Sequence, residues 1–121
     1  MTRIVELTIN EPDTTGYAAF EDGQLVRAVF VNLHAWVANS TGTRPVVHIG
    51  LDFVNGTTTA VTATAQRLVI KYADDTQNLT WAGQSYEETA DVRPTGQLQL
   101  ETIELSEGLD LRATEAIVLT F

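Results

Sequence analysis

The sequence has 121 residues, of which 16 are acidic and 7 basic, so its formal net charge is −9. A surface of this sign repels phosphate groups, which argues against a nucleic acid or an anionic membrane as the partner. The chain contains no cysteine, which rules out disulfides, thiolate metal sites and cysteine nucleophiles. Apolar residues make up 44% and charged residues 19%, as is typical of one globular domain with a single core.

The amino-terminal residues enter a strand pattern at once, so the sequence predicts no signal peptide. Its longest apolar stretches are also far too short to span a membrane. We therefore expect either an intracellular protein or a piece of a longer one.

The first half of the chain alternates apolar and polar residues with a period of two, the pattern of half-buried strands. Val5, Leu7 and Ile9 mark the first strand, and a second is expected over residues 17–20. Asp22-Gly23 predicts a tight hairpin turn, because both residues tolerate positive φ.

Residues 25–33 are apolar at nearly every position and predict a central strand that is buried on both faces. Within this strand Arg27 would need a carboxylate or carbonyl partner, since an unpaired buried guanidinium is very costly. Pro45 begins the next predicted strand. Its residues on one face are Val47, Ile49, Leu51 and Phe53.

Strand patterns continue to the end of the chain. Asn55-Gly56 predicts a turn into a strand over residues 59–70, and residues 73–80 read as a loop. A β-bulge is expected near Glu101-Thr102, where the apolar alternation slips by one residue. A final strand is expected to close the chain at Phe121.

No window shows sustained helical spacing, and the threonine-rich composition favours strands. We predict an all-β fold, an antiparallel β-sandwich of about eight strands that forms a single domain over residues 1–121.

Three pairs of acidic residues are candidates for paired catalytic carboxylates: Glu21-Asp22, Asp74-Asp75 and Glu87-Glu88. Neighbouring residues of a strand point to opposite faces, so these pairs are expected to be solvated turn charges rather than a glycosidase pair.

The two histidines, His34 and His48, show no metal-ligand spacing. His48 and Asp52 share a predicted strand face but lie about 13 Å apart along it. The sequence thus predicts no catalytic residue, no cofactor-binding residue and no metal site.

Four aromatic residues in or beside loops are candidates for a sugar-stacking platform: Trp36, Tyr72, Trp81 and Tyr86. Such a platform would make the chain a carbohydrate-binding module, although large aromatic side chains more often belong to a core. Trp81 is alternatively expected to plug one end of the sandwich. Three N-x-[ST] sequons, at Asn39, Asn55 and Asn78, are possible N-glycosylation sites in predicted turns or loops.

Several segments resemble the C-terminal β-domain of glycoside hydrolase family 79, the β-glucuronidases and their heparanase relatives. Residues 4–7 (IVEL) and 17–33 (YAAFEDGQLVRAVFVNL) are similar to the start of that domain, where the family pattern is Y-A-x-Y-E-x-G-x-L-x-R-x-x-x-x-N-L. Residues 44–51, the segment WAGQSY at 81–86 and residues 116–119 are similar to later parts. The resemblance covers nearly the whole chain.

The resemblance implies a non-catalytic accessory domain. In the family a (β/α)₈ barrel carries the two catalytic glutamates of a retaining mechanism, and the β-sandwich packs against this barrel. Neither glutamate corresponds to a residue of this chain, so no catalytic residue carries over. The implied partner is the catalytic barrel of a parent glycosidase, and the implied location is extracellular, as part of that secreted parent.

The family also often takes one strand of this sandwich from before the barrel. Without that strand we expect an unpaired edge and exposed apolar surface, and therefore self-association of the chain. A standalone carbohydrate-binding module remains the main alternative, and an independent hydrolase is a third. The charge of −9 makes acidic glycans poor ligands for such a module unless arginines cluster locally.

Overall fold

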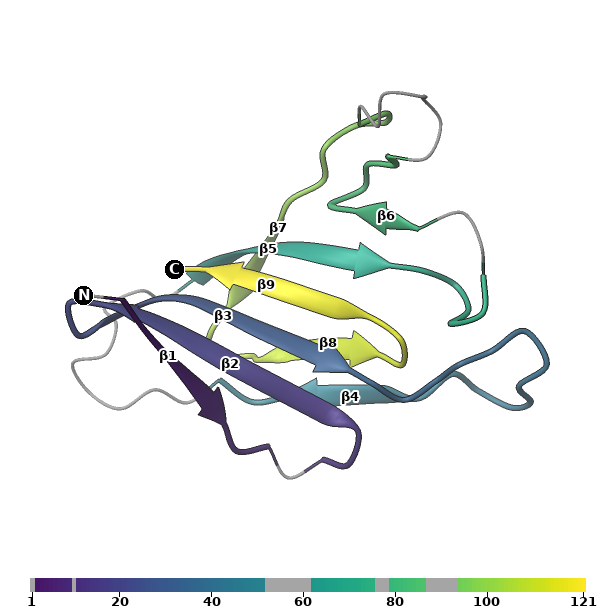
Figure 1. Cartoon of the computed structure of the whole chain (residues 1–121), viewed down its shortest axis with the longest axis horizontal. Helices are drawn as coiled ribbons and strands as arrows, with labels where there is room; N and C mark the ends of the chain where they lie inside the picture. Colours follow the sequence, from purple (N-terminus) through teal and green to yellow (C-terminus); the bar gives the residue numbers. More distant parts are fainter. Residues whose placement is uncertain (1, 10, 52–61, 76–78, 87–93) are drawn as a thin grey trace.

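The computed structural model describes residues 2–9, 11–51, 62–75, 79–86 and 94–121. Within them the chain forms strands and turns and no helix (Figure 1). The strands are β1 (Thr2–Leu7), β2 (Thr14–Glu21), β3 (Gln24–Asn32), β4 (Val46–Ile49), β5 (Thr62–Val69), β6 (Thr80–Trp81), β7 (Glu101–Glu104), β8 (Leu109–Arg112) and β9 (Ala116–Thr120). In these residues, accordingly, no helix is long and apolar enough to cross a membrane.

The strands form two antiparallel sheets of very different size. The larger, seven-stranded sheet has the order β1-β2-β3-β9-β5-β6, and β7 pairs with β5 as well. β4 and β8 form a two-stranded sheet of their own. Figure 1 shows this small sheet lying against the large one. The predicted all-β sandwich is confirmed.

The core fills the space between the two sheets, as the alternation of side chains along each strand requires. From the large sheet, Phe30, Ile117 and Leu119 point inward, and the last two are completely buried. Ile49 of β4 and Leu111 of β8 meet them from the other side. Of these strands, β3, β4 and β9 were expected from the sequence and β8 was not. The predicted inward positions of Val47 and Ile49 in β4 are confirmed.

The turn between β2 and β3 is the predicted two-residue hairpin. Glu21 pairs with Gln24, and the two turn residues have positive φ, 50° at Asp22 and 83° at Gly23. Two positive φ values define a type I′ turn, whose twist suits a hairpin. The register shift between Ala19 and Phe20 places one extra residue, Val26, in β3. Leu25 thereby joins Ala28 and Phe30 on the inner face.

The predicted bulge near Glu101-Thr102 is wrong. β7 begins only at Glu101, and the two preceding leucines, Leu98 and Leu100, lie outside the strand and are 51% and 54% exposed. The apparent slip in the alternation therefore marks the start of a strand rather than an extra residue within one.

Burial of β3 on both faces is also wrong. Leu25, Ala28 and Phe30 are buried, whereas Arg27 is exposed on the opposite face. The physical reason is that only one face of the large sheet is covered by the small one. Arg27 consequently remains in solvent and does not require the partner that burial would have demanded. The predicted turn at Asn55-Gly56 lies outside the described residues.

Candidate functional site

The small sheet covers only the middle of the large sheet's inner face. Two strands cannot span seven, since neighbouring strands lie about 4.8 Å apart. The inner face is therefore left uncovered on two flanks, one beside β4 and the other beside β8. We call them the apolar hollow and the polar hollow, and each is defined by its lining residues below.

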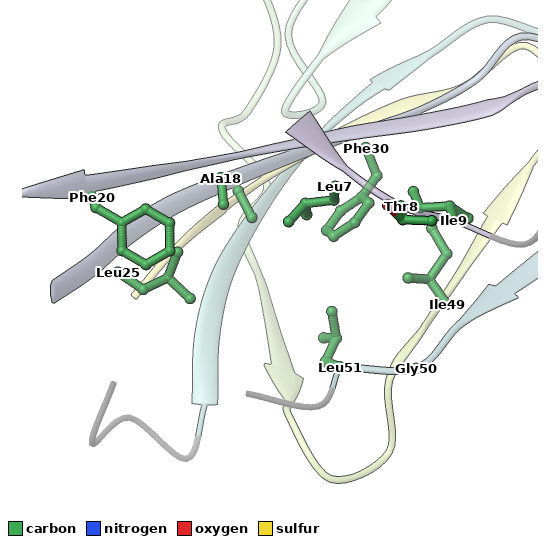
Figure 2. A pocket seen from close by; sticks show the side chains of 11 residues that line it. Leu7, Thr8, Ile9, Ala18, Phe20, Leu25, Phe30, Ile49, Gly50 and Leu51 are labelled. Atoms are coloured by element: carbon green, nitrogen blue, oxygen red, sulfur yellow. The ribbon is translucent and has the colours of Figure 1, made fainter. Parts of the chain in front are cut away.

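The apolar hollow lies between β4 and the inner face of β1, β2 and β3. Its volume is about 230 Å³, and Figure 2 shows the side chains around it. It is lined by Leu7, Thr8, Ile9, Ala18, Phe20, Leu25, Ala28, Phe30, Ile49, Gly50 and Leu51. Nearly all of these are hydrocarbon side chains, so the hollow exposes to water a surface that resembles a core.

The strand edge next to the apolar hollow is open within the described residues, where β4 pairs only with β8. Pro45 accepts a hydrogen bond from the Ala113 N–H at 2.8 Å, so its carbonyl faces β8. Backbone direction alternates along a strand. The N–H and C=O groups of Val46 and His48 therefore point away from β8. They lie on the edge of β4 that borders the apolar hollow.

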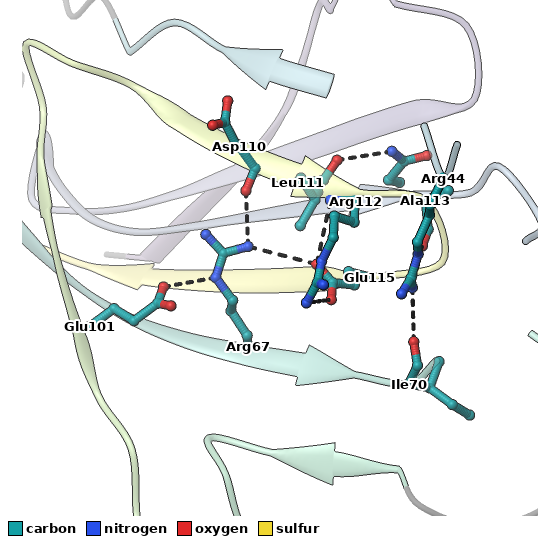
Figure 3. A network of polar contacts seen from close by, with 10 residues as sticks. Arg44, Arg67, Ile70, Glu101, Asp110, Leu111, Arg112, Ala113 and Glu115 are labelled. Carbon is teal, nitrogen blue, oxygen red and sulfur yellow. Dashed lines mark hydrogen bonds and ion pairs between the residues drawn. The ribbon is translucent and has the colours of Figure 1, made fainter. Parts of the chain in front are cut away.

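The far edge of β8 is closed by two side chains instead of a strand (Figure 3). The Arg67 Nη1 donates to the Asp110 carbonyl at 2.9 Å, and the Arg112 N–H donates to Glu115 Oε1 at 3.3 Å. These backbone groups are the ones that an incoming strand would have to use. Of the two edges of the small sheet, the one at β4 is thus the edge left for pairing among the described residues.

Arg67 and Glu115 belong to a larger network of charges. Arg67 Nε donates to Glu101 Oε2 at 2.7 Å, and Arg112 Nη2 lies 2.8 Å from Glu115 Oε2. Arg67 Nη1 is also 3.8 Å from Glu115 Oε1. Glu115 is only 1% exposed, and a buried carboxylate requires such partners. Sequence reasoning missed this network; its one local signal was Glu115, a charge beside the apolar last strand.

The four predicted glycan contacts fall into two groups. The Ala73 N–H donates to the Trp36 carbonyl, which joins the loops of half-buried Trp36 and Tyr72. Trp81 pairs with Leu68 from β6 and is half-buried. Tyr86, after the following turn, is 38% exposed. A glycan-binding role for these side chains stays a prediction.

The predicted N-glycosylation sites are only partly within the described residues. Asn39 is exposed, as an acceptor must be. Asn55 and Asn78 lie outside the described residues. Modification of any of the three remains a prediction.

Three of the candidate catalytic carboxylates accept hydrogen bonds from the fold instead of facing one another. Asp74 Oδ1 accepts from the Ala38 N–H at 3.1 Å, and Asp75 Oδ2 accepts from the Tyr72 N–H at 3.2 Å. Glu21 accepts from the Thr2 hydroxyl at 2.8 Å. Glu87 and Glu88 lie outside the described residues.

Each histidine faces a carboxylate that the sequence did not suggest. His48 Nδ1 is 2.7 Å from Asp110 Oδ1, its cross-strand neighbour on β8, and both side chains are exposed. His34 Nδ1 is 3.8 Å from Asp13 Oδ2. Asp52, considered with His48 above, lies outside the described residues. Within the part that is described, no group of three or more His, Asp or Glu side chains is arranged to hold a metal ion.

The sequence and the fold are both similar to known proteins. The family model described as the glycosyl hydrolase family 79 C-terminal beta domain matches residues 16–118. A crystal structure of 4-O-α-L-rhamnosyl-β-D-glucuronidase from Fusarium oxysporum 12S, in complex with Rha-GlcA, is similar over 98% of this chain, with a TM-score of 0.74 and 24% identity. This chain spans 26% of that protein's chain. A search of curated proteins found no match.

Proposed function

Because the chain belongs to the family of the glycosyl hydrolase family 79 C-terminal β domain, we propose that it is a non-catalytic accessory domain that packs against the catalytic domain of a parent glycosidase. The observation that carries this proposal is the apolar hollow beside an open strand edge. Apolar surface of this kind in a folded domain marks a contact site.

The proposed contact combines a strand with apolar side chains. A segment of the parent pairs with the outward-facing backbone groups of Val46 and His48, and its alternate side chains fill the hollow, as in strand addition generally. Each aliphatic side chain buried in this way contributes about 1.5–3 kcal/mol. The backbone pairs fix the register, and the hollow selects hydrophobic residues at every second position.

Closure of the other edge directs the partner to β4. A strand that paired with β8 would have to displace Arg67 from the Asp110 carbonyl and Glu115 from the Arg112 N–H. This displacement would also strip partners from a buried carboxylate, which costs several kcal/mol. Pairing at β4 requires no such loss.

In the absence of the parent segment, the same surface supports self-association of the chain. When a second copy pairs at β4, the apolar hollow of each copy is covered by the other in a symmetric dimer. Such dimers are the commonest form of homo-oligomer. Self-association is therefore part of the proposal and provides a simple readout of the contact surface.

The activity of the parent is proposed by analogy. The similar structure is a glucuronidase bound to Rha-GlcA, which supports a parent that acts on glycans containing a uronic acid. Secretion with the parent enzyme belongs to the same proposal. Exposed Asn39 is compatible with a secretory route.

The test uses two glutamate substitutions on the same strand. Phe20 lines the apolar hollow, whereas Tyr17 is 43% exposed on the outer face. We expect Phe20→Glu to abolish both self-association and co-purification with the catalytic domain encoded with this chain, because it places a charge in the contact. Tyr17→Glu should leave both intact.

Two results would contradict the proposal. One is equal loss of association in both variants while thermal unfolding shows that both remain folded. The other is turnover of a nitrophenyl glucuronide by the purified chain itself, beyond that of a mock preparation. The first would place the contact elsewhere, and the second would make the domain an enzyme.

A further inference from the structure

The polar hollow on the opposite flank has the size of a small-ligand site. It lies beside β8 on the inner face of β5, and its volume is about 300 Å³, near the lower limit for pockets that hold small molecules. It is lined by Arg67, Val69, Thr80, Ala82, Gly83, Gln99, Glu101 and Arg112. This composition is unlike that of the apolar hollow.

The charges around the polar hollow balance one another, whereas the whole molecule is acidic. Its walls hold the guanidinium groups of Arg67 and Arg112 and the carboxylate of Glu101, and buried Glu115 pairs with both arginines. Two positive and two negative groups leave no local excess of negative charge in a chain whose net charge is −9. An acidic ligand is therefore repelled less at this hollow than by a surface of average charge.

Both guanidinium groups are held in place before any ligand arrives. Glu101 and the Asp110 carbonyl bind the Nε and Nη1 of Arg67, whose side chain is 19% exposed. Glu115 binds the Nη2 of Arg112, whose side chain is 52% exposed. The long side chains have thus already lost much of the conformational freedom that binding would otherwise remove. The half-exposed guanidinium of Arg112 has further N–H donors that a ligand can approach.

A strained turn forms the opposite wall. Ala82 and Gly83 have φ of 50° and 81°, and the Ala82 N–H donates to the Arg67 carbonyl at 2.9 Å. The Gln99 N–H donates to the Ala82 carbonyl at 2.6 Å. A Cβ on Gly83 would lie 2.6 Å from Gln99 Cγ, so glycine allows the Gln99 side chain to pack on the turn. Strain of this kind is often retained at functional sites.

We propose that the polar hollow binds a small hydroxylated ligand that carries a carboxylate. The carboxylate lies against the guanidinium groups of Arg112 and Arg67, whose planar donors match its two oxygens. The Gln99 amide and the Thr80 hydroxyl, which can both donate and accept, hydrogen-bond to hydroxyl groups of the ligand. This site lies on the flank opposite the proposed contact with the parent. The two proposals are therefore tested independently, and failure of one leaves the other unaffected.

The probes are D-gluconate and sorbitol, which share a carbon chain and differ in the carboxylate. Titration of the isotope-labelled chain with each, followed by NMR, is expected to shift resonances of Arg112, Gln99 and Thr80 with gluconate. Sorbitol should bind at least about tenfold more weakly than gluconate, because it lacks the charge-assisted pair. Equal binding of the two probes, or gluconate shifts confined to other surfaces, would overturn the proposal.

Variants separate binding from folding. Gln99→Glu adds a negative charge to the hollow without touching the ion pairs of Glu115, and it should weaken gluconate binding about tenfold. Arg112→Gln should have a similar effect, with thermal unfolding as a check because Glu115 loses a partner. Arg27→Gln removes an exposed charge elsewhere and should change nothing. Unchanged gluconate affinity in folded Gln99→Glu would rule the site out.

Discussion

Thr114 occupies a backbone conformation that is rare for threonine. Its φ is 75°, and a β-branched residue in this region is strained by about 1–2 kcal/mol. Its hydroxyl accepts a hydrogen bond from the Trp36 N–H at 2.9 Å and donates to the His34 carbonyl at 3.0 Å. These two bonds tie the long loop after β3 to the turn between β8 and β9, which explains why the strain is tolerated.

The hydroxyl of Thr114 can be tested apart from the strain. Thr114→Ser keeps the two hydrogen bonds and removes the β-branch, whereas Thr114→Ala loses both bonds. We expect the alanine variant to be less stable than the serine variant by about 1–2 kcal/mol, the net value of such bonds. Urea denaturation measures the difference. Equal stability of the two variants would show that the hydroxyl does not hold the loop.

Arg44 shows how a charged residue of the family-like segments serves the fold. Its Nη2 donates to the Ala113 carbonyl at 2.7 Å and to the Ile70 carbonyl at 2.8 Å. Pro45, the next residue, accepts from the Ala113 N–H. Arg44 and Pro45 therefore bind the carbonyl and the N–H of Ala113, in the turn between β8 and β9. This structural role explains the Arg-Pro pair without a catalytic one.

At the scale of elements, the charge network closes the space between β5, β8 and the turn before β9. Glu115 is nearly fully buried and lies beside two arginines. Removing one member of such a buried group leaves the others without compensation, which costs more than the pair itself contributes. The network is thus a condition for the small sheet to stay on the large one.

Glu115→Ala should consequently lower the free energy of unfolding by about 3 kcal/mol. Glu104→Ala, which removes an exposed carboxylate from β7, should change it by less than about 0.5 kcal/mol. Urea denaturation of the two variants provides the comparison. Similar small effects for both would mean that the buried carboxylate contributes little to holding the two sheets together.

The sequence predicted the strands far better than their arrangement. Alternation is local, so β1 to β5 and β9 were located, and Asp22-Gly23 fixed a hairpin that involves only neighbouring residues. The pairing of β4 with β8 joins residues such as His48 and Asp110 that lie 62 positions apart. No short-range pattern encodes this pairing, nor therefore the two hollows that it leaves beside the small sheet.

The candidate site was unpredictable for the same reason. Arg67 and Glu115 are isolated in the sequence and meet only after β5 and β9 pair. Arg27, by contrast, was expected to be buried because its strand is apolar on both faces. That expectation fails because an apolar outer face does not guarantee a covering layer. The exposed edge was expected only from the family resemblance.

At the scale of the whole molecule, the domain is asymmetric about its small sheet. One flank is apolar and has an open strand edge, and the other is polar with its edge closed by side chains. We infer that the first flank receives a strand of the catalytic domain and the second stays available to solvent. This difference determines the orientation that we propose for the domain on its parent.

Hydrogen exchange along β4 tests this account most directly. In a dilute, monomeric solution of the chain, the outward-facing amides of Val46 and His48 should exchange fast, while those of Val47 and Ile49, which face β8, exchange slowly. When the catalytic domain is bound, the amides of Val46 and His48 should slow by at least about a hundredfold. Unchanged fast exchange at both positions in the assembled enzyme would contradict strand addition at β4.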